Sequence, residues 1–205
     1  MVFGFAFDGK ETDENGQGTH TAGIAGSTTF GVAKGANIIA VKVMAQGRSS
    51  AGLINGFHWM VERHNRRKYL PGFRGSVASM SLANKVPSDP LDYLVKYASA
   101  AGIHFAVAAG NDNQGACMTS PGRASRESDI VTVGSINVSD QRSIFSNFGP
   151  CVTLYAPGEI IVSTGIGRPP PPRSTLVPQW PVPTSRALWR SSSPRILHSS
   201  LILLR

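Results

Sequence analysis

Residues 14–26 read Glu-Asn-Gly-Gln-Gly-Thr-His-Thr-Ala-Gly-Ile-Ala-Gly. Asn15 or Thr19 can cap a helix, so this pattern predicts a helix that runs to Gly26. The glycines are not a dinucleotide-binding loop, because the third glycine of that motif is absent and no β-rich strand is expected before them. Gln17 therefore lies close to the start of a predicted helix.

Outward from this helix, residues 1–167 alternate between expected strands and expected helices. Short β-branched runs predict strands, and longer capped segments predict helices. The expected strands are at 36–44, 75–82, 103–108, 130–134 and 152–155, and the expected helices at 50–68 and 89–101. Asp89 and Pro90 begin the last of these helices, and Gly102 closes it. The alternation predicts a parallel α/β sheet covered on both faces, with functional groups at the carboxyl ends of its strands.

The length and the charge of the chain exclude several classes of function. The chain has 205 residues, a length that predicts one domain. Its formal net charge is +8. Six arginines and no acidic residue fall within residues 168–205, so the excess charge does not form a basic patch on the folded part. We therefore expect no nucleic-acid partner. We also expect no membrane partner, since no apolar run reaches about 18 residues, and no signal peptide is expected at the start of this sequence.

The composition of the chain changes after Gly167. Residues 168–205 hold eight of the fourteen prolines and have no hydrophobic period. Two interpretations are open. This segment is either a disordered Pro/Arg/Ser-rich tail, which its composition favours, or a segment translated out of its coding frame.

Residues 14–26 resemble the histidine motif D-x-N-G-H-G-T-H-x-A-G of subtilisin-like serine proteases (subtilases). Other family motifs follow in the same order along the chain, at residues 31–33, 41–43, 80–83, 108–111, 145–149 and 155–158. The chain is most similar to the proteinase K-like branch. The resemblance implies a partial peptidase domain over residues 1–167. Its fold class would be α/β, a subtilisin-like three-layer parallel sheet with helices on both faces, incomplete at both ends.

The resemblance also implies two catalytic positions. In the family, the first histidine of the motif is the general base of a Ser-His-Asp triad, and Gln17 occupies that position. A glutamine amide cannot take a proton from a serine hydroxyl near neutral pH. Asn111 in Ala-Ala-Gly-Asn matches the asparagine that donates a hydrogen bond to the oxyanion. Taken alone, an asparagine after a glycine is a turn residue, and the surrounding motifs favour the oxyanion role.

The resemblance implies substrate-binding residues on two strand ends. These are Ser81, Leu82 and Ala83 after one strand, and Ala108, Ala109 and Gly110 after the next. In the family, a substrate peptide adds itself to the first segment as an extra strand. This chain has Ala83 where glycine is usual, so its Cβ is expected to crowd the substrate backbone.

Cys117 and Cys151 lie in loop-like surroundings, as two separate buried thiols or as one disulfide. Some members of the branch carry cysteines at both places, so the resemblance implies a Cys117–Cys151 disulfide. The branch also binds calcium nearby through an aspartate, and Thr153 stands at that position. A hydroxyl is a poor replacement for a carboxylate on a hard cation. We therefore expect no metal ion and no cofactor.

The other two triad residues are not recognisable in this sequence. No D-[ST]-G string precedes Gln17, so the chain is expected to begin inside the domain. The serine motif G-T-S-M-A-[TS]-P-H should follow residues 163–167. New codons can be built from the third base of the codon of one residue and the first two bases of the codon of the next residue. Residues 176–187 can then encode Gly-Thr-Ser-Met-Ala-Ser-Pro-His-Ile-Ala-Gly. We therefore interpret the chain from about residue 168 onward as out of frame, with no nucleophile.

These residues predict a serine-type endopeptidase by family, inactive as written because the Asp strand is absent, the base is Gln17 and the serine motif is lost. The alternative is a non-catalytic pseudoprotease that binds peptides in the relict cleft. An unrelated α/β binding domain would leave the collinear motifs unexplained. The resemblance implies a peptide or protein substrate, a monomer and an extracellular location.

Overall fold

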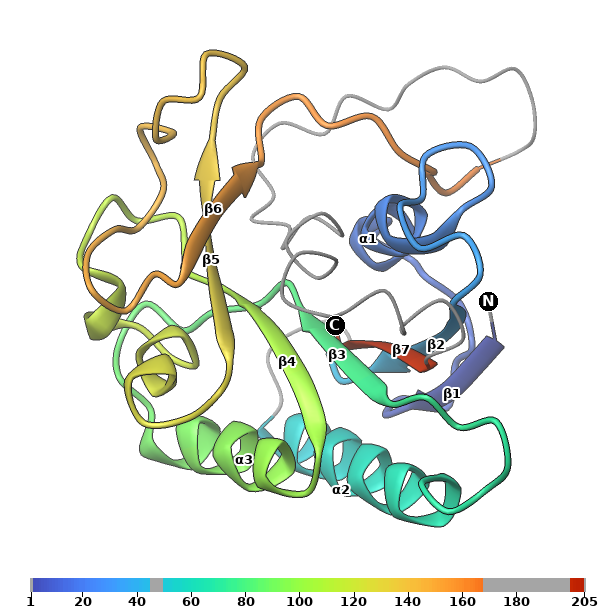
Figure 1. The fold of residues 1–205 in the computed structure, drawn as a ribbon. Helices are drawn as coiled ribbons and strands as arrows, with labels where there is room; N and C mark the ends of the chain where they lie inside the picture. The colour runs from blue at the N-terminus through green and yellow to red at the C-terminus, as the bar shows by residue number, and fades with distance from the viewer. Residues whose placement is uncertain (1, 45–49, 168–199, 205) are drawn as a thin grey trace.

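The computed structural model describes residues 2–44, 50–167 and 200–204. Its centre is a sheet of seven strands in the order β1-β2-β7-β3-β4-β5-β6, and every neighbouring pair is parallel (Figure 1). The strands are β1 (Val2–Ala6), β2 (Asn37–Lys42), β3 (Ser76–Met80), β4 (Ile103–Ala108), β5 (Val131–Ile136), β6 (Leu154–Pro157) and β7 (Ser200–Leu204). The α-helices are α1 (Gln17–Gly26), α2 (Ser50–Arg67) and α3 (Asp89–Ala100), and two short 3₁₀ helices are η1 (Ala116–Met118) and η2 (Gly122–Arg126).

The helices cover the sheet on both faces, with α1 on one side and α2 and α3 together on the other (Figure 1). Successive side chains of a strand point to opposite faces, and β3 shows this division. Val77 packs with Ala22 and Ala25 of α1, whereas Ala78 and Met80 pack in the core beneath α2 and α3. The α/β three-layer arrangement predicted from the sequence is therefore confirmed.

The larger core lies between the sheet and the α2–α3 layer. Its central contact is the stacked pair Phe57 and Phe105, whose ring centroids are 5.9 Å apart and which are each 2% exposed. Met60 and Val95 are fully buried in the same cluster. This apolar layer fixes α2 and α3 beneath the strands, so that the carboxyl ends of the strands present their loops on one edge.

Most predicted elements agree with the structure within a few residues. The predicted helix at 89–101 is α3, although Ser88 rather than Asp89 is its N-cap. The expectation that no strand precedes the motif at 14–26 is wrong, because β1 occupies Val2–Ala6. The strand is not evident from the sequence, because Gly4 interrupts its apolar run. In the structure, the register between β1 and β2 shifts between Phe3 and Phe5.

One of the two interpretations of residues 168–205, a disordered tail, does not hold for residues 200–204. Residues 200–204 form β7, which pairs in parallel with both β2 and β3. Four of its five residues are leucine or isoleucine, which suits a strand with a neighbour on each side. The rest of the predicted tail, residues 168–199 and 205, lies outside the described residues, and its coding frame stays a prediction. Within the described part of the chain, no helix is both long and apolar enough to cross a membrane.

Candidate functional site

Gln17 is the first residue of α1, directly after Gly16, which has a φ of 94°. Its Nε2 atom donates a hydrogen bond of 2.9 Å to the carbonyl oxygen of Ser81. Ser81 follows β3 at the carboxyl edge of the sheet. The structure therefore brings together two residues that are 64 positions apart and that the sequence placed in one site.

Two carboxylates hold the loop that leads into α1. Asp13 accepts hydrogen bonds from the backbone N–H groups of Asn15, Gly16 and Thr19, and from the hydroxyl of Thr19. These bonds satisfy N–H groups at the start of the helix, which have no partner within it. They fix the turn from which Gln17 projects.

The second carboxylate is Asp8, which forms an ion pair with Lys42 at the end of β2. The Nζ–Oδ2 distance is 2.8 Å, and the same Nζ atom donates to the carbonyl oxygen of Thr12 at 3.1 Å. Lys42 thus ties the loop before α1 to the sheet. The hydrogen bond from Lys42 is the main reason that the pKa of Asp8 lies below its ordinary value.

This lowered pKa predicts a pH dependence of stability. The folded state favours ionised Asp8, so its contribution is present above the unfolded-state pKa of about 3.9. It is lost as the pH falls below that value and through the folded-state pKa. The free energy of unfolding should therefore fall less on acidification in Asp8→Asn than in the natural chain. The measurement is urea unfolding of both proteins between pH 5 and pH 2. The same fall in the free energy of unfolding in both proteins would contradict this prediction.

The predicted substrate-binding residues Ser81, Leu82 and Ala83 form a half-buried segment between β3 and an antiparallel bridge. In that bridge Asn84 N donates to Ser120 O at 2.7 Å. The Oγ atom of Ser81 is buried without a hydrogen-bond partner among the described residues. The bridge to Ser120 links this segment to the loop region that follows β4.

That loop carries Ala108, Ala109, Gly110 and Asn111. Ala108 ends β4 and is fully buried, Ala109 is 1% exposed, and Asn111 is half-buried. Because β3 and β4 are neighbours in the sheet, Asn111 lies on the same edge as Ser81, which contacts Gln17. Gln17 thus contacts the end of β3, and Asn111 follows the end of the neighbouring strand β4.

The side chain of Asn147 holds this loop in place, and the sequence did not indicate this role. Its side chain is fully buried. The Nδ2 atom donates to Ala109 O at 2.9 Å, and the Oδ1 atom accepts from Asp112 N at 3.0 Å and Gln114 N at 3.1 Å. Gly110 has a φ of 107°, and a Cβ there would lie 2.4 Å from Asn147 Nδ2. A sequence motif pointed to a turn at Asn147, but the partners of its side chain lie 33–38 positions away.

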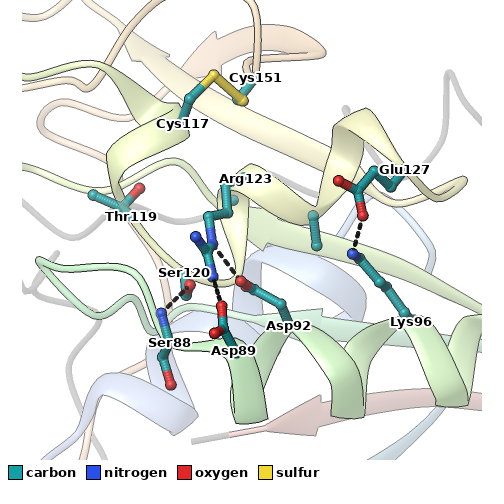
Figure 2. Close-up of polar contacts among 12 residues, drawn as sticks. Ser88, Asp89, Asp92, Lys96, Cys117, Thr119, Ser120, Arg123, Glu127 and Cys151 are labelled. Atoms are coloured by element: carbon teal, nitrogen blue, oxygen red, sulfur yellow. Dashed lines mark hydrogen bonds and ion pairs between the residues drawn. A yellow bond between two sulfur atoms is a disulfide. The ribbon is translucent and has the colours of Figure 1, made fainter.

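The predicted disulfide is present between Cys117 and Cys151, with an S–S distance of 2.06 Å (Figure 2). Cys117 belongs to η1, a few residues after Asn111, and Cys151 is fully buried. The bond ties the loop after β4 to the turn before β6. It therefore holds the Asn111 loop from the side opposite to β3.

Below the disulfide, η2 is clamped to α3 by ion pairs (Figure 2). Arg123 binds both Asp89 and Asp92, and Lys96 binds Glu127. The hydrogen bond from Arg123 to Asp92 is the main reason that the pKa of Arg123 is raised. These groups are already paired with one another. They join η2 and the residue that follows it to α3.

His20 does not replace a base at position 17. It is 3% exposed, and its Nε2 atom lies 3.0 Å from the carbonyl oxygen of Ile161. Ser163 and Thr164 donate their hydroxyls to the carbonyl oxygens of His20 and Thr19. His20 therefore belongs to the contacts that fasten residues 161–164 to α1.

Thr153 also has a structural partner, because its Oγ1 atom accepts a hydrogen bond of 3.0 Å from Thr132 N. Among the described residues, no group of three or more His, Cys, Asp or Glu side chains is placed to hold a metal ion.

The chain is similar to proteins of a known family. The family model described as the subtilase family matches residues 6–192. Cerevisin of Saccharomyces cerevisiae is 45% identical over 77% of this chain and 25% of its own length. The subtilisin-like serine proteases Pen c 2 of Penicillium citrinum and Rho m 2.0101 of Rhodotorula mucilaginosa are 43% and 46% identical over 77% of this chain, and over 35% and 46% of their own lengths. The chain thus spans less than half the length of these curated relatives.

One solved structure extends the comparison to the fold. The crystal structure of a cold adapted subtilisin-like serine proteinase superposes with a TM-score of 0.69 and 39% sequence identity. The match covers 80% of this chain and 57% of that protein.

Proposed function

The chain belongs to the subtilase family, and from this premise we propose that it is a serine endopeptidase by descent in which catalysis is lost. A subtilase hydrolyses peptide bonds with a serine nucleophile, a histidine that carries its proton and an aspartate that orients the histidine. The proton-transfer step is the one that this chain cannot perform.

One observation carries the proposal, namely the hydrogen bond from Gln17 Nε2 to Ser81 O. The amide nitrogen is a donor in this bond, and its lone pair is delocalised into the carbonyl, so it does not take up a proton near neutral pH. The side chain at the position of the family base therefore acts as a brace between α1 and the end of β3. A general base must accept a proton at reaction pH, and no such group stands there.

At Asn111 the residue is the same as in the family motif, so its side-chain amide can still act as a hydrogen-bond donor. Its side-chain amide could donate to an oxyanion at the end of β4, where Asn147 and the disulfide hold the loop in place. Such a donor is worth about 3–4 kcal/mol in a working site. Without a nucleophile and a base, however, no oxyanion forms for it to stabilise.

We expect the full chain to hydrolyse fluorogenic peptides no faster than the buffer does. Gln17→His should leave this rate unchanged, because triad residues act as a unit and restoring one of them restores no catalysis. The measurement is the initial rate over a panel of peptide substrates, with a serine-directed inhibitor in a parallel series.

The matched control is Asn111→Ala, which should also leave the rate at the buffer level. A rate above buffer that falls by about 100-fold in Asn111→Ala would show a working oxyanion site. Inhibition of that rate by the serine-directed reagent would point to a nucleophile in residues 168–205. Either result would overturn the proposal.

A peptide-binding pseudoprotease is the second candidate, and the structure gives a reason to rank it lower. A substrate strand would need the backbone carbonyls of residues 81–83 as acceptors. The carbonyl of Ser81 already accepts from Gln17, and Ala83 adds a Cβ to the segment. Saturable binding of a labelled peptide to the natural chain would favour this candidate, and Gln17→Ala should then strengthen the binding, because it frees the carbonyl of Ser81.

We further propose that this chain needs no calcium ion near Thr153. Its hydroxyl serves as the acceptor for Thr132 N, so its side chain bridges β5 and the segment before β6. Ca²⁺ sites are rich in carboxylate ligands, and a neutral hydroxyl supplies no charge. We expect EDTA to leave the melting temperature unchanged within about 1 °C. A clear fall that added calcium reverses would contradict this, since a bound ion stabilises by mass action.

For the ancestral activity, we propose a peptide or protein substrate, a monomeric protein and an extracellular location. The Cys117–Cys151 disulfide supports the last point, because such bonds persist in oxidising compartments.

A further inference from the structure

The centre of the sheet depends on a strand that is distant in the sequence. β2 and β3 are connected through α2, yet they do not pair with each other, because β7 lies between them. Residues 200–204 pair with residues 37–41 of β2 and with residues 76–80 of β3. If β7 left, β2 and β3 would stand roughly 9–10 Å apart, about twice the spacing of paired strands. Neither could then satisfy its inward-facing N–H and C=O groups.

The space between β2 and β3 has a defined chemistry, and we call it the strand slot. It accepts a strand that runs parallel to both neighbours over five residues. Ile38 and Val77, next to the slot, are buried toward α1, whereas Ala78 and Met80 are buried toward α2 and α3. A strand with a neighbour on both sides must be free of proline, and one buried on both faces must be apolar. The segment Ser-Leu-Ile-Leu-Leu contains no proline, and four of its five residues are apolar.

The connection to β7 does not force the strand into the slot of its own chain. Residues 168–199 link the last described loop to β7, and a segment of this length can reach at most roughly 100 Å. A strand linked to its slot competes with a free strand through its effective concentration, which is on the order of millimolar for linked binding modules. A second copy at a similar concentration competes with it.

We propose that the strand slot is an exchange site, and that residues 200–204 of a second copy of this chain occupy it. The product is a dimer in which each copy completes the sheet of the other. The contacts are those of the monomer, so the concentration of chains decides between the two forms. At dilute concentrations each chain fills its own slot.

The test uses three full-length proteins: the natural chain, Ile202→Pro and Ile202→Val. Proline removes the N–H group of a residue that lies between Ile39 and Ala78 in the ladders, whereas valine keeps the N–H group. Each protein is unfolded and then refolded at about 1 µM and at about 1 mM, and its mass is measured by light scattering. At 1 mM we expect about a tenth or more of the natural chain and of Ile202→Val as dimer, and none of Ile202→Pro.

A second measurement keeps the test decisive if Ile202→Pro is poorly folded. A synthetic peptide of residues 199–205 is added at about 1 mM, and it should raise the melting temperature of Ile202→Pro. The same peptide with proline at position 202 should not. The proposal is wrong if the natural chain stays monomeric at 1 mM, if Ile202→Pro dimerises equally, or if Ile202→Pro melts like the natural chain. It is also wrong if the peptide fails to stabilise Ile202→Pro.

Discussion

Asn147→Ala is expected to lower the free energy of unfolding by about 3–5 kcal/mol, since each buried partner left without a hydrogen bond costs about 1–3 kcal/mol. The substitution removes the donor to Ala109 O and the acceptor for Asp112 N and Gln114 N. The side chain is fully buried, so water replaces these bonds poorly. The measurement is urea unfolding followed by circular dichroism.

The matched control for this variant is Asn65→Ala. Asn65 is exposed on α2, so its replacement should change stability by less than about 0.5 kcal/mol. A fall of less than about 1 kcal/mol in Asn147→Ala would mean that the loop rearranges to satisfy its own backbone groups. Asn147 would then not be the brace of the Asn111 segment.

Replacement of both Cys117 and Cys151 by alanine is expected to lower the free energy of unfolding by roughly 3–4 kcal/mol in the chain-entropy model. The disulfide closes a loop with a sequence separation of 34. The closed loop restricts the conformations of the unfolded oxidised chain, and the unfolded double variant is free of this restriction. The measurement is denaturant unfolding of the oxidised protein, the double variant and the natural protein with a reductant.

The reductant supplies the control for this experiment. It should destabilise the natural protein to about the level of the double variant and should leave the variant unchanged. An oxidised protein that is no more stable than the variant would contradict the prediction. It would mean that the constraint is offset by strain in the folded state.

The sequence predicted the elements whose signals are local. The helix over 89–101 follows from Asp89, Pro90 and Gly102, and these residues lie at its two ends in the structure. Strands 75–82 and 103–108 follow from short apolar runs, because a strand buried on both faces needs no alternation. The disulfide followed from a family resemblance, since spacing alone left two interpretations open.

The parts that were missed depend on contacts between distant residues. Nothing near Asn147 in the sequence shows that its amide meets Ala109 and Asp112, because burial and partners arise only after β4 and β5 align. The brace from Gln17 to Ser81 is of the same kind. β7 was missed for the opposite reason. The composition of residues 168–205 is typical of disorder, but five residues suffice for a strand when two neighbours lack a partner.

The position of β7 also bears on the order of events during synthesis. Ser200 pairs with Asn37, which leaves the ribosome about 160 residues earlier. At about 5–20 residues per second, β2 and β3 wait roughly 5–30 s for the strand that joins them. During that time both present open edges, which are templates for pairing with other chains. The nascent chain therefore keeps two open strand edges until residues 200–204 are made, and a chaperone that covers exposed strand edges would have its greatest effect on yield in this interval.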